Sequence, residues 1–353
     1  MIRNKGRLQA WVLQTFFSLP FSPGDAYNVD GAGAPMTIYN ERQDDYRQMK
    51  KKEIRGIIFA VLAGICWGFS GTMGQYLFSA KNMDTGWLTT VRMICSGAIL
   101  LLITFFTQRP KLKAVWQRRE TTIHMILTAV FGLMLVQYAY LAAIKYTNAG
   151  TGTAMQYLGE TFLLLVTCIT MKRLPQLIEV LGLIFAMVGV FLISTHGNLH
   201  SMVMTKQGLF WGIIAALTLM LYTLLPVKLV QEFGALVVTG YGMLIGGLVL
   251  LVIERPWRTK VQLDIQTISA MAAVILVGTV LSYTIYLQSA ADIGGVKAGL
   301  LAAVETISAP TMSAIWLGTK FTLPDILGFA FIIAMVILLA VPGLKAQKKE
   351  EQA

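Results

Sequence analysis

Ten apolar runs of about twenty residues dominate the chain, and they constrain its fold more than any other feature. A bilayer-spanning helix needs about 20 mostly apolar residues. Helices are the expected form, because lipid offers no hydrogen-bond partner to a free backbone group. We therefore predict an all-α integral membrane protein with ten transmembrane helices. The runs cover roughly 57–78, 87–107, 122–144, 150–171, 177–195, 207–228, 235–253, 266–287, 296–317 and 324–342.

The composition supports the membrane class and argues against a nucleic-acid-binding protein. Hydrophobic residues make up 56% of the 353 residues and charged residues 13%, whereas soluble domains carry about 25% charge. The formal net charge is +11. The basic residues nevertheless stand in short clusters between the apolar runs, as in the cytoplasmic loops of membrane proteins, and form no single dense patch.

The sequence shows no signature of an enzyme or of a bound cofactor. It has no P-loop, so ATP is not expected to supply the energy, and it has no catalytic Ser/His/Asp set and no zinc motif. The three cysteines, Cys66, Cys95 and Cys168, fall inside apolar runs without a CxxC pair. We interpret them as reduced thiols without a special role.

Residues 1–53 differ from the rest of the chain. We interpret them as a disordered cytoplasmic tail, and 343–353 as a second one. A signal peptide is the weaker alternative, because polar residues interrupt the apolar patch near the N-terminus and no good cleavage site follows. A further hypothesis is that translation starts at Met36 or Met49, which N-terminal sequencing of untagged protein would test.

The distribution of basic residues predicts the orientation. With the N-terminus inside, the inside loops hold sixteen Lys and Arg residues and the outside loops hold seven. Cytoplasmic loops carry the excess of positive charge. We predict that both termini are cytoplasmic and that the protein lies in the plasma membrane of a bacterium. The main exception is the loop 254–265, which places three basic residues outside.

The two halves of the chain repeat each other. The Tyr-Leu pair at 140–141 recurs at 286–287, and the Leu-Gly pair at 181–182 recurs at 327–328. Both pairs recur after 146 residues. Such self-similarity indicates a duplicated architecture.

We place the first repeat at 56–195 and the second at 207–342. Each repeat contains five predicted helices, and this odd number makes the second repeat enter the membrane from the opposite side. Inverted-topology repeats accompany alternating access and a binding site between the halves.

Two carboxylates are the strongest candidates for that site. Glu160 and Gln156 are four residues apart, which would place them on one face of a helix. Glu305 has small neighbours on its helix face. Ionisable groups at membrane depth are costly, and they usually mark a substrate or ion pathway. We expect them to bind a cationic group, with proton coupling as an open alternative. A structural hydrogen bond between helices is the competing interpretation.

Aromatic side chains supply a second group of candidates. Trp67 and Tyr222 lie in the middle of predicted helices, and Tyr283 opens the second copy of the repeated segment. Aromatic faces bind amines and stack on aromatic substrates. For any single tyrosine, packing or anchoring at the membrane interface is the simpler explanation. Gln137 is a weaker candidate that could merely bridge two helices.

Other polar residues are predicted to have ordinary roles. Arg92 is expected to be structural, either extending outward to the interface or pairing with a carboxylate. Asp292 is expected to be solvated at a cytoplasmic turn. His196 and His200 flank a Gly-Asn pair in a short loop, where a metal-binding helix would not continue.

The chain resembles the EamA family of the drug/metabolite transporter superfamily over about 56–341. The family usually reads E-P followed by L-G-E-R, whereas this chain has Thr306 and Thr319 in place of the Pro and the second Glu. The resemblance implies a ten-helix secondary transporter, often an exporter of amino acids or amines, with a central cavity between the halves. The segments that carry it are Cys66-Trp67-Gly68, Arg92, Ala149-Gly150, Val304-Glu305-Thr306, Leu317-Gly318-Thr319-Lys320 and Leu327-Gly328.

Together these features predict a secondary active transporter, an exporter of small polar metabolites such as amino acids or amines. Its partners would be that small-molecule substrate and membrane lipid, with no metal and no cofactor. The alternatives are a membrane-embedded enzyme or lipid-handling protein, and a passive channel. The predicted substrate-binding or coupling residues are Trp67, Gln137, Gln156, Glu160, Tyr222, Tyr283 and Glu305.

Overall fold

The structure, a computed structural model, describes the backbone of residues 36–198 and 203–350 and the side chains of 50–198 and 203–341. The predictions for 1–35 and for His200 lie outside these residues. Throughout the described part of the chain the regular structure is helical, without strands. Among the described residues, ten spans are long and apolar enough to cross a membrane, which confirms the predicted class.

The first repeat provides five of these spans. The third is a π-helical segment between two α-helices, and the fourth consists of two helices. In order the elements are α2 (Met36–Lys81), α3 (Thr85–Ala114), α4 (Arg119–Leu127) with η1 (Thr128–Met134) and α5 (Leu135–Tyr146), α6 (Ala149–Tyr157) with α7 (Gly159–Met171), and α8 (Leu177–Thr195).

The second repeat copies this order, including the π-helical segment and the two-part fourth span. A short helix, α10 (Val227–Phe233), and a 3-10 turn, η2 (Pro256–Arg258), lie in its connections. The spans are α9 (Lys206–Leu224), α11 (Ala235–Glu254), α12 (Ile265–Ala272) with η3 (Ala273–Leu281) and α13 (Ser282–Ile293), α14 (Gly295–Ala302) with α15 (Glu305–Leu317), and α16 (Leu323–Glu350).

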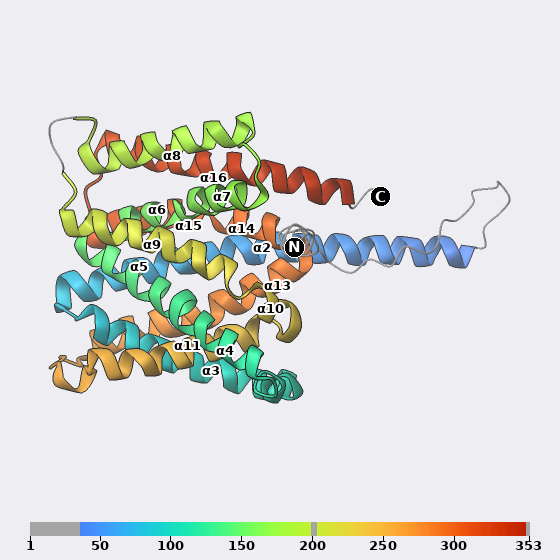
Figure 1. Ribbon diagram of the computed structural model, residues 1–353, viewed down its shortest axis with the longest axis horizontal. Coiled ribbons are helices and arrows are strands. Elements are labelled where there is room, and N and C mark those ends of the chain that lie inside the picture. The colour runs from blue at the N-terminus through green and yellow to red at the C-terminus, as the bar shows by residue number, and fades with distance from the viewer. Residues whose placement is uncertain (1–35, 199–202, 351–353) are drawn as a thin grey trace.

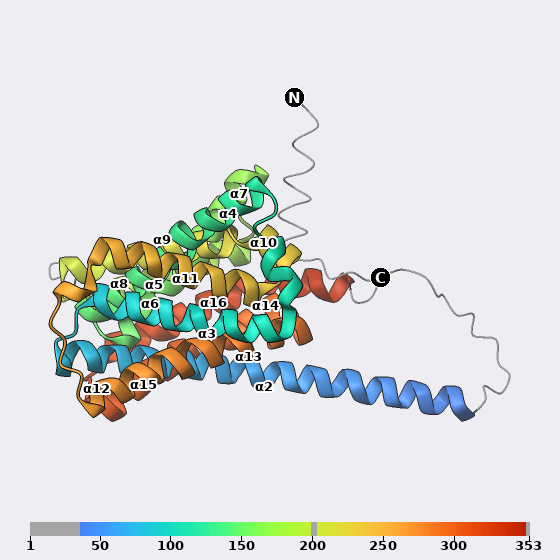
Figure 2. The same cartoon turned by 90° about the horizontal axis from the view of Figure 1, so that it is seen from below.

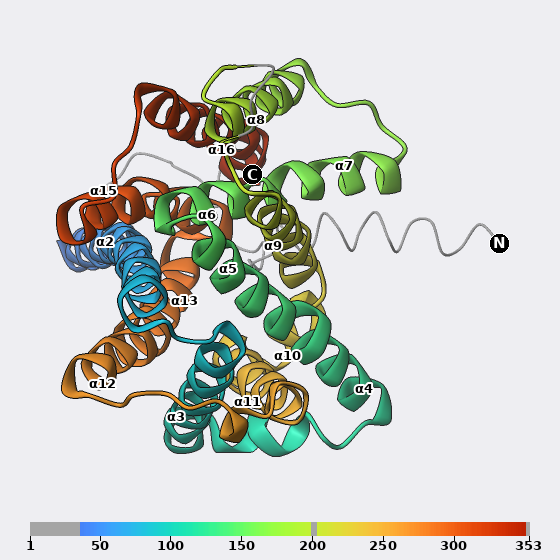
Figure 3. The ribbon, with the colours of Figure 1, turned by 90° about the vertical axis from the view of Figure 1, so that its left-hand side faces the viewer.

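The spans pack as two inverted repeats would. The pair α3 and α11 lies at one edge of the bundle and the pair α8 and α16 at the opposite edge (Figure 3). Between them α2 packs on η3 and α13, and α9 packs on the corresponding η1 and α5. These contacts between the halves match one another, as an approximate two-fold relation in the membrane plane requires.

The fourth span of each repeat is broken. The spans predicted over 150–171 and 296–317 are present, but each is interrupted, the first at Leu158 and the second between Ala302 and Glu305. Hydrogen bonds to the carbonyl three residues earlier, instead of four, form these turns. One example is the 3.2 Å bond from Leu158 N to Met155 O. Apolar composition does not reveal a break of one or two residues, because both halves of the span remain hydrophobic.

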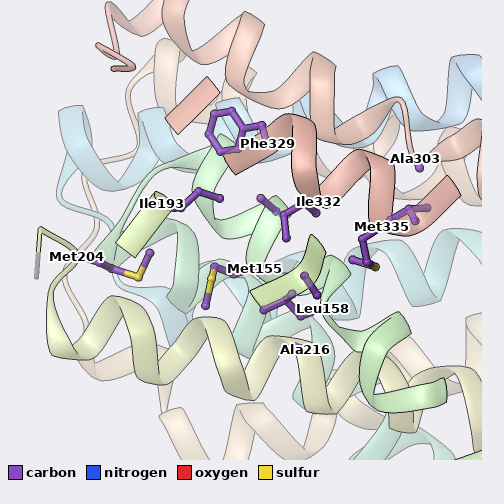
Figure 4. Packing of buried hydrophobic residues seen from close by; sticks show 12 residues of the cluster. Met155, Leu158, Ile193, Met204, Ala216, Ala303, Phe329, Ile332 and Met335 are labelled. Atoms are coloured by element: carbon purple, nitrogen blue, oxygen red, sulfur yellow. The ribbon is translucent and has the colours of Figure 1, made fainter. Parts of the chain in front are cut away.

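Both breaks pack into one hydrophobic cluster, which Figure 4 shows at close range. Leu158 and Ala303 lie there with Ile332 and Met335 of α16. Irregular backbone at membrane depth is tolerated where protein buries it. This cluster therefore covers the two interruptions and excludes lipid from them.

The helix α2 begins before the membrane span. It projects beyond the bundle on the side where α16 ends (Figures 1 and 2). Residues 36–53, which we predicted to be part of a disordered tail, are helical. The physical reason is that no Pro or Gly interrupts the chain between Met36 and Gly56, and the segment is rich in Glu, Gln, Lys and Arg, which favour helix.

Ion pairs join both ends of the membrane part of α2 to the same span of the second repeat. At one end Arg55 binds both carboxylate oxygens of Asp292 at 2.8 Å, so the prediction of simple solvation for Asp292 is wrong. At the other end Lys81 Nζ lies 2.6 Å from Asp264 Oδ2. This hydrogen bond lowers the pKa of the Asp264 carboxyl. The first and eighth spans are thus tied together at both membrane surfaces.

Glycines bring α3 and α11 into backbone contact. A Cβ added to Gly97 would lie 2.5 Å from the backbone nitrogen of Leu244, and one added to Gly247 would lie 2.9 Å from that of Ile94. In lipid, such close approach supplies the packing that holds helices together.

We predict that Gly97→Val destabilises the protein, because the added side chain must separate α3 from α11. Overpacking of this kind costs about 1–3 kcal/mol. The measurement is the thermal unfolding temperature of the purified protein in detergent. The matched control is Gly295→Ala, because a Cβ at Gly295 meets no atom within 4 Å. An unchanged unfolding temperature for Gly97→Val would contradict the close backbone contact.

Candidate functional site

A buried carboxylate, Glu305, lies at the interface between the two halves. It is the first residue of α15 and is 7% exposed. Tyr140 donates a hydrogen bond to its Oε1 at 3.2 Å, and Tyr157 makes a longer contact of 3.4 Å with its Oε2. Both tyrosines belong to the first repeat. The break before α15 places the carboxylate at a helix N-terminus, where backbone N–H groups favour negative charge.

The glycines of α2 position this broken span. A Cβ at Gly64 would collide with the carbonyl of Ala302, and one at Gly68 would collide with the Ser308 hydroxyl. Ser308 Oγ in turn donates to the Gly64 carbonyl at 3.3 Å. These glycines therefore form a packing face that lets the turn before Glu305 approach α2.

The counterpart carboxylate, Glu160, is in a different state. It is the second residue of α7, and its side chain is half-buried. Within the described residues its carboxylate makes no hydrogen bond. It interacts electrostatically with Tyr157 and with Tyr286, the counterpart of Tyr140 in the second repeat. The site is thus nearly symmetric in composition, whereas only one of its two carboxylates is hydrogen-bonded.

Aromatic rings from three spans lie beside these carboxylates. The ring of Trp67 is 5.4 Å from that of Tyr283 and 5.2 Å from that of Tyr286. The Tyr222 hydroxyl interacts with Tyr283. Five of the predicted residues, together with three further tyrosines, form what we call the central cluster. Its members are Trp67, Tyr140, Tyr157, Glu160, Tyr222, Tyr283, Tyr286 and Glu305.

The two predicted glutamines do not join the central cluster. Gln137 is buried against α11, where its Nε2 lies 3.9 Å from the sulfur of Met243. The side chain of Gln156 makes no hydrogen bond to any described residue. The predicted shared face with Glu160 is wrong, because α6 ends at Tyr157 and the turn at Leu158 separates the two residues. The i, i+4 argument holds only along a continuous helix.

Arg92 is buried beside the cluster. It is 3% exposed, and its Nε donates to Thr279 Oγ1 at 2.9 Å. Its Nη1 has no hydrogen-bond partner among the described residues. The prediction that Arg92 extends to the interface or pairs with a carboxylate is therefore wrong, because the side chain points into the bundle and forms no ion pair with any described residue. Its electrostatic neighbours are Tyr283, Tyr140 and Glu305.

A second polar centre, which sequence reasoning missed, surrounds Gln75 on α2. Its Oε1 accepts hydrogen bonds from the backbone of Ala149 at 2.8 Å and from Ser313 Oγ at 2.7 Å. Its Nε2 donates to Thr319 Oγ1 at 2.9 Å. Gln75 thus satisfies the first free N–H of α6 and connects it with α15. No pattern marks it in the sequence, because its partners are up to 244 residues away.

The repeated sequence segment contains a signal for two tyrosines of the cluster. Tyr140 and Tyr286 occupy the same place in the repeated segment, as do Glu160 and Glu305 one residue out of register. In a two-fold arrangement, a residue of one repeat can face the residue of the other repeat that corresponds to a nearby residue of its own repeat. This reasoning selects the Tyr140–Glu305 pair and its mate Tyr286–Glu160. Tyr157 has no such signal.

The charges and rings of the cluster define what it can bind. Two carboxylates and several aromatic faces suit a cationic group, and the Arg92 guanidinium suits an anionic one. The described residues include no group of three His, Cys, Asp or Glu side chains able to hold a metal. His196 lies apart from the cluster, 3.1 Å from Asp325.

A fold of ten spans in two broken-helix repeats around a polar interface is that of a membrane transporter. The sequence pattern of the EamA-like transporter family matches residues 54–195 and 206–341. The chain belongs to this family, and it is a transporter rather than an enzyme.

Known relatives agree with this assignment. The chain is 32% identical over 287 residues to YicL, an uncharacterized inner membrane transporter of Salmonella typhimurium, covering 81% of this chain and 95% of the relative. It is 24% identical to YyaM, an uncharacterized transporter of Bacillus subtilis, covering 79% and 90%. A crystal structure with 12% sequence identity shares the fold, with a TM-score of 0.56 over 84% of this chain and 98% of the other.

We predict that Gln75→Ala destabilises the protein, because it leaves the buried N–H of Ala149 without its acceptor, while the hydroxyls of Ser313 and Thr319 keep only their bond to each other. An unsatisfied buried group costs about 1–3 kcal/mol. The measurement is again the unfolding temperature in detergent, with Gln207→Ala, at an exposed position on α9, as the matched control. Equal unfolding temperatures for the two variants would contradict a structural role for Gln75.

Proposed function

We propose that the protein is a secondary active transporter that exports small polar metabolites such as amino acids or amines. The observation that supports this best is the buried Glu305 carboxylate, held between the halves by Tyr140 and Tyr157. A carboxylate at membrane depth is costly unless it has a partner or a function. Both of its hydrogen-bonding tyrosines come from the other repeat, so movement of one half against the other changes its environment.

The asymmetry of the site supports alternating access. In this state Glu305 is hydrogen-bonded to Tyr140, whereas Glu160 is half-buried and interacts with Tyr286 only electrostatically. The inverted repeats allow a second state in which these roles are exchanged. In that state Tyr286 would hold Glu160, and Glu305 would be released. Exchange of conformation between inverted repeats opens a central site alternately to the two sides of the membrane.

The chemistry of the central cluster supports an ammonium group as the feature recognised. Glu160 offers a carboxylate that no described residue hydrogen-bonds. Trp67, Tyr283 and Tyr286 offer aromatic faces next to it. A cation near such a face gains about 0.5–2 kcal/mol, more when water is excluded. Protonation of Glu305 would provide the coupling to a proton gradient.

The relatives and the charge distribution support a location and an orientation. YicL is named as an inner membrane transporter, and we propose the inner membrane for this chain. The described ends of α2 and α16 emerge on the same side of the bundle (Figure 1). The excess of basic residues on that side supports cytoplasmic termini.

We predict that Glu305→Gln strongly reduces transport while the protein still folds. The amide keeps the shape of the carboxylate and removes its charge, so ammonium binding and proton coupling are both lost. The measurement is counterflow of pooled amino acids and amines in proteoliposomes, with and without a pH gradient. The control is Glu120→Gln, at an exposed position in the first turn of α4.

Saturable counterflow in the wild type distinguishes a carrier from a passive channel, which shows no stimulation by substrate on the opposite side. Full activity of Glu305→Gln would contradict a role for this carboxylate in transport.

We predict that a membrane-impermeant maleimide applied to intact cells labels Gln262→Cys and does not label Gln117→Cys. Both positions are exposed, and they lie in loops at opposite ends of the bundle. The variants are made in a background that lacks Cys66, Cys95 and Cys168. Labelling of Gln117→Cys alone would show that the orientation is reversed.

A further inference from the structure

The Arg92 guanidinium is buried without a counter-ion, and this feature is unexplained by the cation-binding chemistry proposed above. It is 3% exposed, and Nε is bound by Thr279 while Nη1 is unpartnered. A charge buried in protein is normally paired and fully hydrogen-bonded, because its desolvation is costly. Arg92 meets neither condition among the described residues.

The π-helical segment η3 shapes the surroundings of Arg92. Thr279 Oγ1 donates to the carbonyl of Val274, five residues earlier, at 3.0 Å, and it accepts the hydrogen bond from Arg92 Nε. The wider turn thus places this hydroxyl where it fixes one edge of the guanidinium. π-helical turns are frequent at functional sites.

Two buried serines near Arg92 also lack hydrogen-bond partners. Ser96 lies one turn along α3, and Ser70 packs against Gly278, the residue before Thr279. Hydroxyls in membrane helices usually donate to the carbonyl four residues earlier, as Thr89, Thr90 and Thr104 do here. The Oγ atoms of Ser70 and Ser96 make no hydrogen bond to any part of the chain that the structure describes. Three buried polar atoms, Arg92 Nη1 and Ser96 Oγ on α3 and Ser70 Oγ on α2, therefore have no hydrogen-bond partner among the described residues.

Among the described residues no carboxylate forms an ion pair with Arg92, and Glu305 interacts with it electrostatically at longer range. The groups facing Arg92 from other spans are Tyr283, Tyr140 and Glu305. The tyrosines are neutral at ordinary pH, and Glu305 is hydrogen-bonded to Tyr140 and forms no ion pair with Arg92 in the described structure. The guanidinium therefore lies next to the central cluster with an unused donor.

We infer that Arg92, oriented by Thr279, is the binding site for an oxyanion of the substrate, a carboxylate in the simplest case. This inference rests on the proposed function and deepens it. Guanidinium and carboxylate match in a planar, two-hydrogen-bond geometry. With a carboxylate on Arg92 and an ammonium group at Glu160 or Glu305, the site complements a zwitterion. The transporter then selects substrates that carry both charges over amines that carry only one.

The test compares matched probe pairs that differ in one carboxylate: tryptophan with tryptamine, phenylalanine with phenethylamine, and lysine with cadaverine. Each probe competes for counterflow in proteoliposomes that contain the full-length protein. For the wild type we expect the carboxylate member of at least one pair to compete at a concentration about 10- to 100-fold lower, as a charge-assisted hydrogen bond provides.

Variants of Arg92 assign this preference to the residue. In Arg92→Gln, the concentration at which the amino acid competes is expected to rise about 10- to 100-fold, while that of the amine stays within about threefold. This change removes the preference for the carboxylate. Arg92→Lys keeps the charge without the planar geometry and is expected to be intermediate. Arg118→Gln, at an exposed loop position, is the matched control. Folding is checked by gel filtration and by the unfolding temperature.

Several outcomes would overturn the inference. Equal competition by both members of every pair in the wild type would do so, and this result needs no variant to fold. An equal rise in the competing concentrations of both probes of a pair in Arg92→Gln would also overturn it. So would an unchanged preference for the carboxylate in that variant. Transport of amines alone would overturn the inference and leave the carrier function standing. A wild-type protein that transports no probe would contradict the proposed function itself.

Discussion

Lipid supplies no hydrogen bonds, and this constraint governs where the chain can interrupt its helices. The breaks at Leu158 and between Ala302 and Glu305 free backbone groups at membrane depth, which is tolerated only inside protein. They are buried in one apolar cluster against α16, and the glycines of α2 admit the second break. The polar site follows from this arrangement, because each break is followed by a carboxylate at a helix N-terminus.

The central cluster combines near symmetry in composition with asymmetry in contacts. Both repeats contribute a carboxylate after a broken helix and a tyrosine that faces the opposite repeat. In this structure only the Glu305 pair is hydrogen-bonded, and Arg92 has no counterpart that fills its role. The paired carboxylates and tyrosines are compatible with two equivalent conformations. The asymmetric part gives the site two kinds of charge, which suits recognition of a substrate with a defined orientation.

Part of the candidate site was predictable from the sequence and part was not. Glu160, Glu305, Trp67, Tyr222 and Tyr283 were identified from polarity and helix position, since charged and aromatic groups in apolar runs are conspicuous. Gln156 was chosen from a spacing that assumed a continuous helix, and the break removed its basis. The surroundings of Arg92 were misjudged and Gln75 was missed, because the side chains that contact these residues come from distant spans.

The sequence by itself determined the class, the ten spans and the two-fold repetition. The reason is that membrane insertion depends on apolar length, which each segment displays locally. Tertiary structure alone decided which residues meet. Whether a buried polar group is paired depends on the side chains that neighbouring helices bring within about 3 Å. No local pattern records that Tyr140 reaches Glu305, that Arg92 lacks a counter-ion, or that Arg55 and Lys81 tie α2 to one partner span.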